Sequence, residues 1–116
     1  MKKADKNTIV LFDVNSSNNY AKRLIAEDKA LHGTVVLAYH QKTGKGHSGN
    51  VWESEANKNL LVSIILFPTF LPAGAQFYLS KIISLAIIEL LKDELVSASI
   101  KWPNDIYVDD KKIAGI

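Results

Sequence analysis

The feature that most constrains the fold is a long apolar run at residues 75–95, which lies between shorter runs of β-branched residues. Its apolar positions continue almost all the way round a helix until Glu89, which predicts a long and well-buried helix. The most membrane-like part, residues 77–91, contains Lys81 and two serines and is shorter than the ~18–20 apolar residues that a span requires. We therefore expect the core helix of a soluble protein and no membrane partner.

The remaining segments predict short strands and one further helix. Residues 19–31 have near-helical apolar spacing and are followed by Gly33, a typical helix stop. The apolar run at residues 59–67 predicts a strand that is covered on both faces. A polar loop is expected at residues 42–58 and a hairpin turn at 109–112. Further strands are predicted at residues 8–12, 34–40, 99–102, 106–108 and 113–114.

This order, β-α-β-β-α-β-β-β, predicts one α+β domain with a mixed, largely antiparallel sheet and helices packed on one face. A net charge of +2 is too small to indicate a nucleic-acid partner. The absence of cysteine excludes disulfides, thiolate zinc sites and cysteine nucleophiles, and suits the cytoplasmic location that we expect. His32, His40 and His47 do not share a metal-ligand spacing, so we expect no metal held by protein side chains.

The first motif with chemical potential is the glycine-rich stretch at residues 44–52. Successive backbone N–H groups in such a loop form an anion-binding concavity, and interleaved cations add charge. Lys45 and His47 alternate with glycines, so both side chains are expected to face one phosphate group, and Trp52 to lie against a flat apolar group. The stretch contains neither a Walker A loop nor a dinucleotide fingerprint. An ordinary surface loop with a packed tryptophan explains the spacing equally well.

The second motif is the segment at residues 101–105, Lys-Trp-Pro-Asn-Asp, with Lys112 and Gly115 behind it. A lysine, a rigid turn and an Asn-Asp pair at a strand end would present a donor, an acceptor and a carboxylate together. The alternative is a tight turn in which Asn104 or Asp105 bonds its own backbone. A third group, Ser-Ser-Asn at residues 16–18, is typical of a helix N-cap, and a cap is compatible with ligand contact.

Together these segments resemble the catalytic domain of the biotin–protein ligase family, from about Val14 onward. Residues 16–18 resemble the family's Ser-Thr-Asn step beside biotin, and residues 44–52 its Gly-Arg-Gly-Arg loop. Residues 101–105 carry the family's most specific signature unchanged, and residues 112–116 match its Lys-x-Ala-Gly-Ile segment. The resemblance implies a biotin/lipoate ligase-like fold. It assigns biotin contacts to Ser16, Ser17, Asn18, Gln41, Gly44 and Gly115.

The resemblance also implies the reaction. ATP with Mg²⁺ and biotin would be the substrates, biotinyl-AMP the intermediate, and a lysine on the biotin carrier protein domain of a biotin-dependent carboxylase the acceptor. Cationic side chains from two distant segments would converge where the biotin carboxylate meets the α-phosphate, and Asp105 would orient or deprotonate the acceptor amine. The implied catalytic residues are Lys112, Asp105, Lys45 and His47, and the adenylate contacts are Lys45, Gly46, His47, Gly49, Trp52, Asn104 and Lys112.

Two alternatives stay open beside this hypothesis. One is lipoate or octanoate transfer on the same fold, although the lipoate ligases lack the Lys-Trp-Pro-Asn-Asp signature. The other is a non-catalytic, degenerate module, against which the intact Lys101, Asn104, Asp105 and Lys112 argue.

The domain boundaries form a further expectation. Because residues 112–116 resemble an unfinished strand, we expect residues 1–116 to be the N-terminal part of one truncated catalytic domain, incomplete for efficient activity. No N-terminal DNA-binding domain is expected before Val14. The open edge of the last strand leaves a homodimer as an open prediction.

His47 departs from the family, which commonly has arginine at this place. Histidine near neutral pH is only partly charged and lacks the planar bidentate fork of arginine. We expect His47→Arg to slow release of the adenylate from the full-length enzyme. Release can be followed by stopped-flow fluorescence, and an unchanged rate would argue against a phosphate contact at this position.

Overall fold

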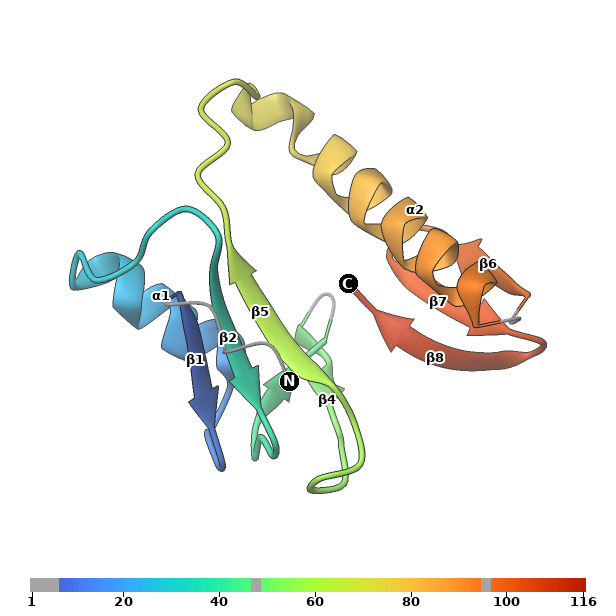
Figure 1. The fold of residues 1–116 in the computed structure, drawn as a ribbon, viewed down its shortest axis with the longest axis horizontal. Coiled ribbons are helices and arrows are strands. Elements are labelled where there is room, and N and C mark those ends of the chain that lie inside the picture. Colours follow the sequence, from blue (N-terminus) through green and yellow to red (C-terminus); the bar gives the residue numbers. More distant parts are fainter. Residues whose placement is uncertain (1–6, 47–48, 95–96) are drawn as a thin grey trace. The chain divides into compact units, whose positions relative to one another are not determined.

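The computed structural model describes residues 7–46, 49–94 and 97–116 (Figure 1). The chain forms two compact units, Met1–Phe67 and Pro68–Ile116, which are described in turn. The predicted α+β class is confirmed, with mixed and largely antiparallel strand pairing. The strands are distributed over three sheets in the described part of the chain.

The first unit is built on a three-stranded sheet with one helix against it. The sheet has the order β1-β2-β5, in which β1 (Thr8–Leu11) runs parallel to β2 (Thr34–Ala38) and β5 (Leu61–Ile65) runs antiparallel to it. Helix α1 (Ser17–Ala26) contacts β2 and β5. The core that they enclose consists of Ala21, Leu24, Val36 and Ile65.

Helix α1 begins as the polar residues before it predict, but it ends before Leu31. The Ser16 side chain accepts a hydrogen bond from the Asn19 N–H at 3.3 Å, which confirms the N-cap. At the other end Asp28 adopts a φ of 56°, and the N–H of Lys29 donates to the Leu24 carbonyl at 2.9 Å. A residue in the left-handed conformation with such a hydrogen bond typically ends a helix, so α1 ends before Asp28 and not at Gly33.

Strand β5 is shorter and less covered than its apolar sequence predicts. Leu61, Ser63 and Ile65 are buried, whereas Val62 and Ile64 are 42% and 53% exposed. Successive residues of a strand point to opposite faces, and α1 covers one of these faces. Within the first unit one face of β5 is covered, and the predicted covering of its other face stays a prediction.

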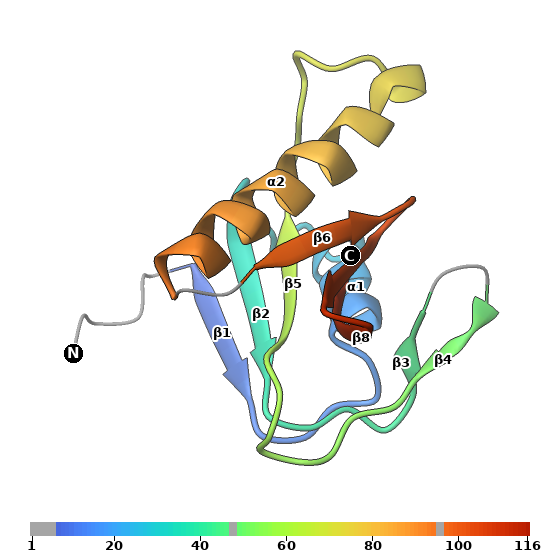
Figure 2. The ribbon, with the colours of Figure 1, turned by 90° about the vertical axis from the view of Figure 1, so that its right-hand side faces the viewer.

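The segment predicted as a polar loop contains a short hairpin. Strands β3 (Gly44–Lys45) and β4 (Val51–Trp52) pair antiparallel, with Gly44 opposite Trp52 and Lys45 opposite Val51 (Figure 2). Two-residue strands are too short to produce a recognisable alternation, which is why periodicity did not indicate them.

The second unit consists of α2 (Phe77–Asp93), preceded by the short helix η2 (Ala73–Ala75), and an antiparallel sheet of order β6-β7-β8. The strands are β6 (Ala98–Lys101), β7 (Asp105–Val108) and β8 (Lys111–Gly115). Asp109, with a φ of 52°, and Asp110 form the turn between β7 and β8, so the predicted hairpin is confirmed, but Lys111 and Lys112 belong to β8 and not to the turn. The Trp102–Pro103 peptide bond that joins β6 to β7 is cis.

Helix α2 is confirmed as a helix, and within its own unit only one side of it is covered. Ser84 is its one buried residue, and Tyr78, Ile82, Leu85 and Leu90 are each about 60% exposed. The helix contacts β6 and β7, which cover one side of it, while its apolar residues continue round the other sides. By length and composition Ala73–Asp93 would also suffice to cross a membrane, a property that core helices share.

Candidate active site

The loops that follow β1 and β2 run side by side and carry the first group of predicted residues. Val14 and Gln41 form an isolated parallel bridge. The Val14 N–H donates to the His40 carbonyl at 3.1 Å, and the N–H of Lys42 donates to the Val14 carbonyl at 3.0 Å. These bonds prolong the β1–β2 pairing beyond the strands and bring Gln41 to the N-terminus of α1.

A polar cluster lies at this point, formed by Ser17, Asn18, Gln41 and Ser63. The Ser17 N–H and hydroxyl donate to Oε1 of Gln41 at 3.2 and 3.4 Å. The Ser17 and Ser63 hydroxyl oxygens lie 2.9 Å apart, and Ser63 also donates to the Asn18 side chain. Ser16, which caps α1, and Ser17 and Ser63 are buried. The structure therefore brings the residues predicted at 16–18 and 41 together, in a cluster with donors and acceptors for a small polar ligand.

Ser63 was missed by the sequence analysis. It is the one polar residue in the apolar run at residues 60–67. A hydroxyl on the buried face of a strand requires a hydrogen-bond partner, so its position in that alternation was a usable signal.

Ser63→Ala should therefore weaken binding of the ligand that this cluster holds, by about fivefold to tenfold, since a net hydrogen bond contributes roughly 1 kcal/mol. Ligand titration calorimetry would measure the change. Ser54→Ala is the matched control, because the Ser54 hydroxyl lies outside the cluster, where it donates to the Glu55 carbonyl at 3.5 Å and accepts from the Asn59 side-chain amide at 3.0 Å. Equal affinity in the Ser63→Ala and wild-type proteins would separate Ser63 from the binding site.

Gly44 packs directly against the polar cluster. A Cβ atom at this position would stand 2.4 Å from Nε2 of Gln41 and 2.5 Å from the backbone carbonyl oxygen of Trp52. Real Cβ atoms essentially never approach so closely, and a backbone oxygen in a paired strand cannot move aside. Glycine is therefore required for close approach between the hairpin and Gln41.

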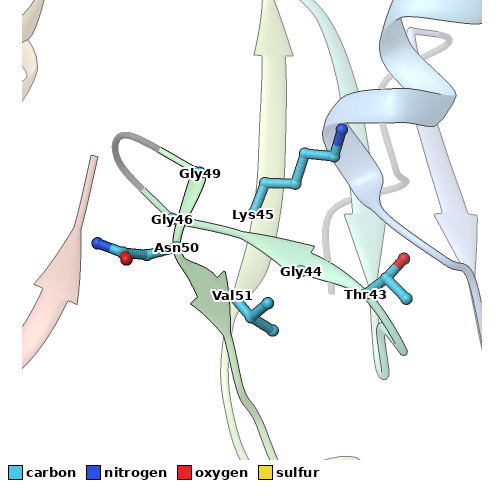
Figure 3. Close-up of a pocket in the computed structure, with 7 residues that line it drawn as sticks. All are labelled: Thr43, Gly44, Lys45, Gly46, Gly49, Asn50 and Val51. Atoms are coloured by element: carbon cyan, nitrogen blue, oxygen red, sulfur yellow. The ribbon is translucent and has the colours of Figure 1, made fainter.

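The residues of the hairpin line an open pocket of about 320 Å³ (Figure 3). Lys45 is exposed, and its side chain extends away from Asn50. The Gly46 N–H donates to the Asn50 carbonyl at 2.6 Å, so this amide is occupied in the hairpin. Gly49 has a φ of 82°, which glycine adopts without strain. The pocket thus gathers the predicted Gly44, Lys45, Gly46 and Gly49, together with Thr43, Asn50 and Val51, whereas His47 lies outside the described residues.

The second unit contains the other group of predicted residues. Nζ of Lys112 lies 2.8 Å from Oδ1 of Asp105, an oxygen that is inaccessible to solvent and has no other partner in the described chain. Asp105 stands opposite Gly115 in the β7–β8 pairing. The Asn104 side-chain amide donates to the Ile116 carbonyl at 3.0 Å, and the Asn104 carbonyl accepts from the Ile116 N–H at 2.9 Å. The β7–β8 hairpin thus brings Asn104, Asp105, Lys112 and Gly115 together.

These two clusters lie in different units, so the predicted convergence of Lys45 and Lys112 on one pocket stays a prediction. Trp52 is half-buried on β4 and is opposite Gly44. Within residues 7–46, 49–94 and 97–116, no group of three or more His, Asp or Glu side chains is arranged to hold a metal ion.

Known proteins resemble this chain over nearly its whole length. The profile of the biotin/lipoate A/B protein ligase family matches residues 11–116. The bifunctional ligase/repressor BirA of Bacillus subtilis is 31% identical over 109 residues, which cover 93% of this chain and 33% of that protein.

Two solved structures resemble it as well. The biotin protein ligase of Aquifex aeolicus, in complex with biotin and ATP, aligns with 96% of this chain and 45% of its own, at 32% identity and a TM-score of 0.79. The biotin acetyl coenzyme A carboxylase synthetase of Helicobacter pylori, with bound biotinylated ATP, aligns with 93% of this chain and 52% of its own, at 30% identity and a TM-score of 0.69.

This chain therefore spans about a third of the curated relative and about half of each solved chain. The family match extends over both units and includes every predicted site residue. The chain belongs to the biotin/lipoate A/B protein ligase family.

Proposed function

We propose that the protein, as it occurs in the cell, activates biotin with ATP to form biotinyl-AMP and transfers the biotinyl group to a lysine of a carboxylase carrier domain. The observation that carries this proposal is the cluster of the buried Ser17 and Ser63 with the half-buried Gln41, beside the glycine hairpin. Hydroxyl and amide groups at fixed positions suit a ureido ring, which offers two N–H donors and one carbonyl acceptor.

The pocket beside this cluster suits the anionic end of the reaction. Attack of the biotin carboxylate on the α-phosphate brings two anions together, and the repulsion must be offset by positive charge. Lys45 lines the hairpin pocket and Lys112 is held by its ion pair with Asp105. Magnesium would enter with the nucleotide as part of the substrate and would neutralise the leaving pyrophosphate.

The second half-reaction requires an uncharged amine on the carrier. The lysine nitrogen attacks the acyl carbon of the mixed anhydride, an amide bond forms, and AMP leaves with the bonding electrons. We assign this step to Asp105, whose carboxylate would accept the proton of the carrier ammonium or orient the amine.

Several relatives carry names that agree with this proposal. The Aquifex aeolicus structure contains biotin and ATP, and the Mycobacterium tuberculosis relative is a biotin–[acetyl-CoA-carboxylase] ligase that is 28% identical over 111 residues. We also propose a cytoplasmic location, with which the absence of cysteine from this sequence is compatible.

Titration calorimetry on the natural protein tests the ligand assignment. We expect binding of biotin and no detectable binding of lipoate or octanoate under the same conditions. Binding of lipoate with none of biotin would assign the protein to the lipoate branch of the family, and binding of neither would favour a degenerate module.

A further inference from the structure

The Asp13 carboxylate binds both residues that flank Gln41. Its Oδ1 lies 3.0 Å from Nδ1 of His40, and its Oδ2 lies 3.2 Å from Nζ of Lys42. Alternate residues of an extended segment point to opposite sides. His40 and Lys42 therefore meet Asp13 on one side, while Gln41 meets Ser17 on the other.

These contacts continue the register of the sheet beyond the end of β1. The last β1–β2 pair is Leu11 with Ala38, and Val14 pairs with Gln41 in the isolated bridge. Between them, the Phe12 and Tyr39 rings stack with centroids 5.6 Å apart, and Asp13 meets His40. Each pair has the separation of 27 that relates Asp13 to His40, so the side-chain contacts of Asp13 follow the register that the backbone hydrogen bonds continue beyond the strands.

Asp13 carries its charge at neutral pH. The hydrogen bond from Lys42, and after it that from His40, lowers the pKa of this carboxyl below its ordinary value of 3.8, although desolvation opposes the shift. A lowered pKa means that the carboxylate form of Asp13 persists at neutrality, and the stabilisation that it provides is lost as the pH falls through the lowered value. Exposed ion pairs contribute little to global stability, so we expect the effect of this group to be local.

We propose that Asp13 is a positioning residue, which clamps His40 and Lys42 so that the Gln41 amide stays in hydrogen-bonding range of Ser17. The role in biotin binding rests on the proposed function: a correctly held Gln41 would meet biotin with its amide already oriented. Asp13 itself contacts no substrate, and it affects biotin binding only through the position of Gln41.

The test compares Asp13→Asn with wild type in the natural protein, by biotin calorimetry and by NMR of the Gln41 side-chain amide. We expect Asp13→Asn to raise the biotin Kd about threefold to tenfold, the coupling typical of residues in one polar network. At saturating biotin the kcat should stay near that of wild type, and so should the Tm. Asp13→Glu should retain most of the affinity.

Glu55→Gln is the matched control, because it removes an exposed ion pair with Lys58 of 3.0 Å in the same unit. A Gln41→Ala background decides whether Asp13 acts through Gln41: the effect of Asp13→Asn on Kd should disappear there. The same effect in both backgrounds would overturn the proposal.

The ligand-free NMR spectrum separates this proposal from the proposed function. In Asp13→Asn, but not in Glu55→Gln, we expect the Gln41 amide and Ser17 N–H resonances to shift or broaden. Resonances that stay unchanged would refute the clamp, whether or not the wild-type protein binds biotin. Failure of wild type to bind biotin, with shifted resonances, would refute the biotin assignment alone.

Discussion

Lys112→Met should slow adenylate formation by about 10²–10³-fold, the effect typical of removing one preorganised group that stabilises transition-state charge. Lys112 lies on β8 with its ammonium 2.8 Å from Asp105, so its position is fixed before substrates arrive. The loss should appear in kcat, with a smaller change in the KM for biotin, because the charge that it offsets grows as the carboxylate meets the phosphate. Biotin-dependent pyrophosphate exchange in the natural protein measures both constants.

Lys111→Met is the control for a general change of charge, since Lys111 is the exposed neighbour on the same strand. Removing Lys112 also leaves the inaccessible Oδ1 of Asp105 without its cation, which costs stability. Lys112→Arg preserves the charge and should recover part of the rate, and the Tm of each variant shows whether folding is affected. Equal rates for the Lys111 and Lys112 methionine variants at matched stability would exclude a role for Lys112 in the reaction.

Gly44→Ala should weaken biotin binding by about tenfold to a hundredfold, because overpacking a tight contact typically costs about 1–3 kcal/mol. The added Cβ would stand 2.5 Å from the Trp52 carbonyl oxygen and 2.4 Å from Nε2 of Gln41. The hairpin or the Gln41 amide must therefore move, and either movement disturbs the polar cluster. Titration calorimetry with biotin measures the loss.

Gly74→Ala provides the matched comparison, since a Cβ at Gly74 meets nothing within 4 Å and the φ there is not in the left-handed region. It makes the same chemical change in η2, outside the hairpin and the polar cluster of the first unit, and should leave biotin affinity unchanged. If both alanine variants bind biotin as wild type does, the close approach at Gly44 has no part in ligand binding.

Most of the fold could be predicted from periodicity, and the errors have physical causes. The end of α1 was placed too late because Ala30 and Leu31 continue the helical spacing, whereas Asp28 turns the chain in a left-handed conformation. The apolar circumference of α2 shows that the helix can be covered on all sides but does not predict which segments cover it, and within its own unit β6 and β7 cover one side. The hairpin of β3 and β4 was missed because two-residue strands show no alternation.

The candidate site was predicted unevenly. Spacing alone left residues 16–18 as either a helix cap or a ligand contact, and the structure combines a cap at Ser16 with a polar cluster at Ser17 and Asn18. The pairing of Asp105 with Lys112 follows from the hairpin turn that the sequence predicts. The Asp13 clamp could not be predicted, because it depends on a parallel register between strands separated by a helix.

Pyrophosphate exchange into ATP by the protein as it occurs in the cell tests the central claim most directly. We expect exchange that requires biotin, saturates as biotin is added and is not supported by lipoate or octanoate. Exchange driven by lipoate or octanoate in place of biotin would contradict the account, as would a complete lack of exchange in a folded protein supplied with biotin, ATP and magnesium.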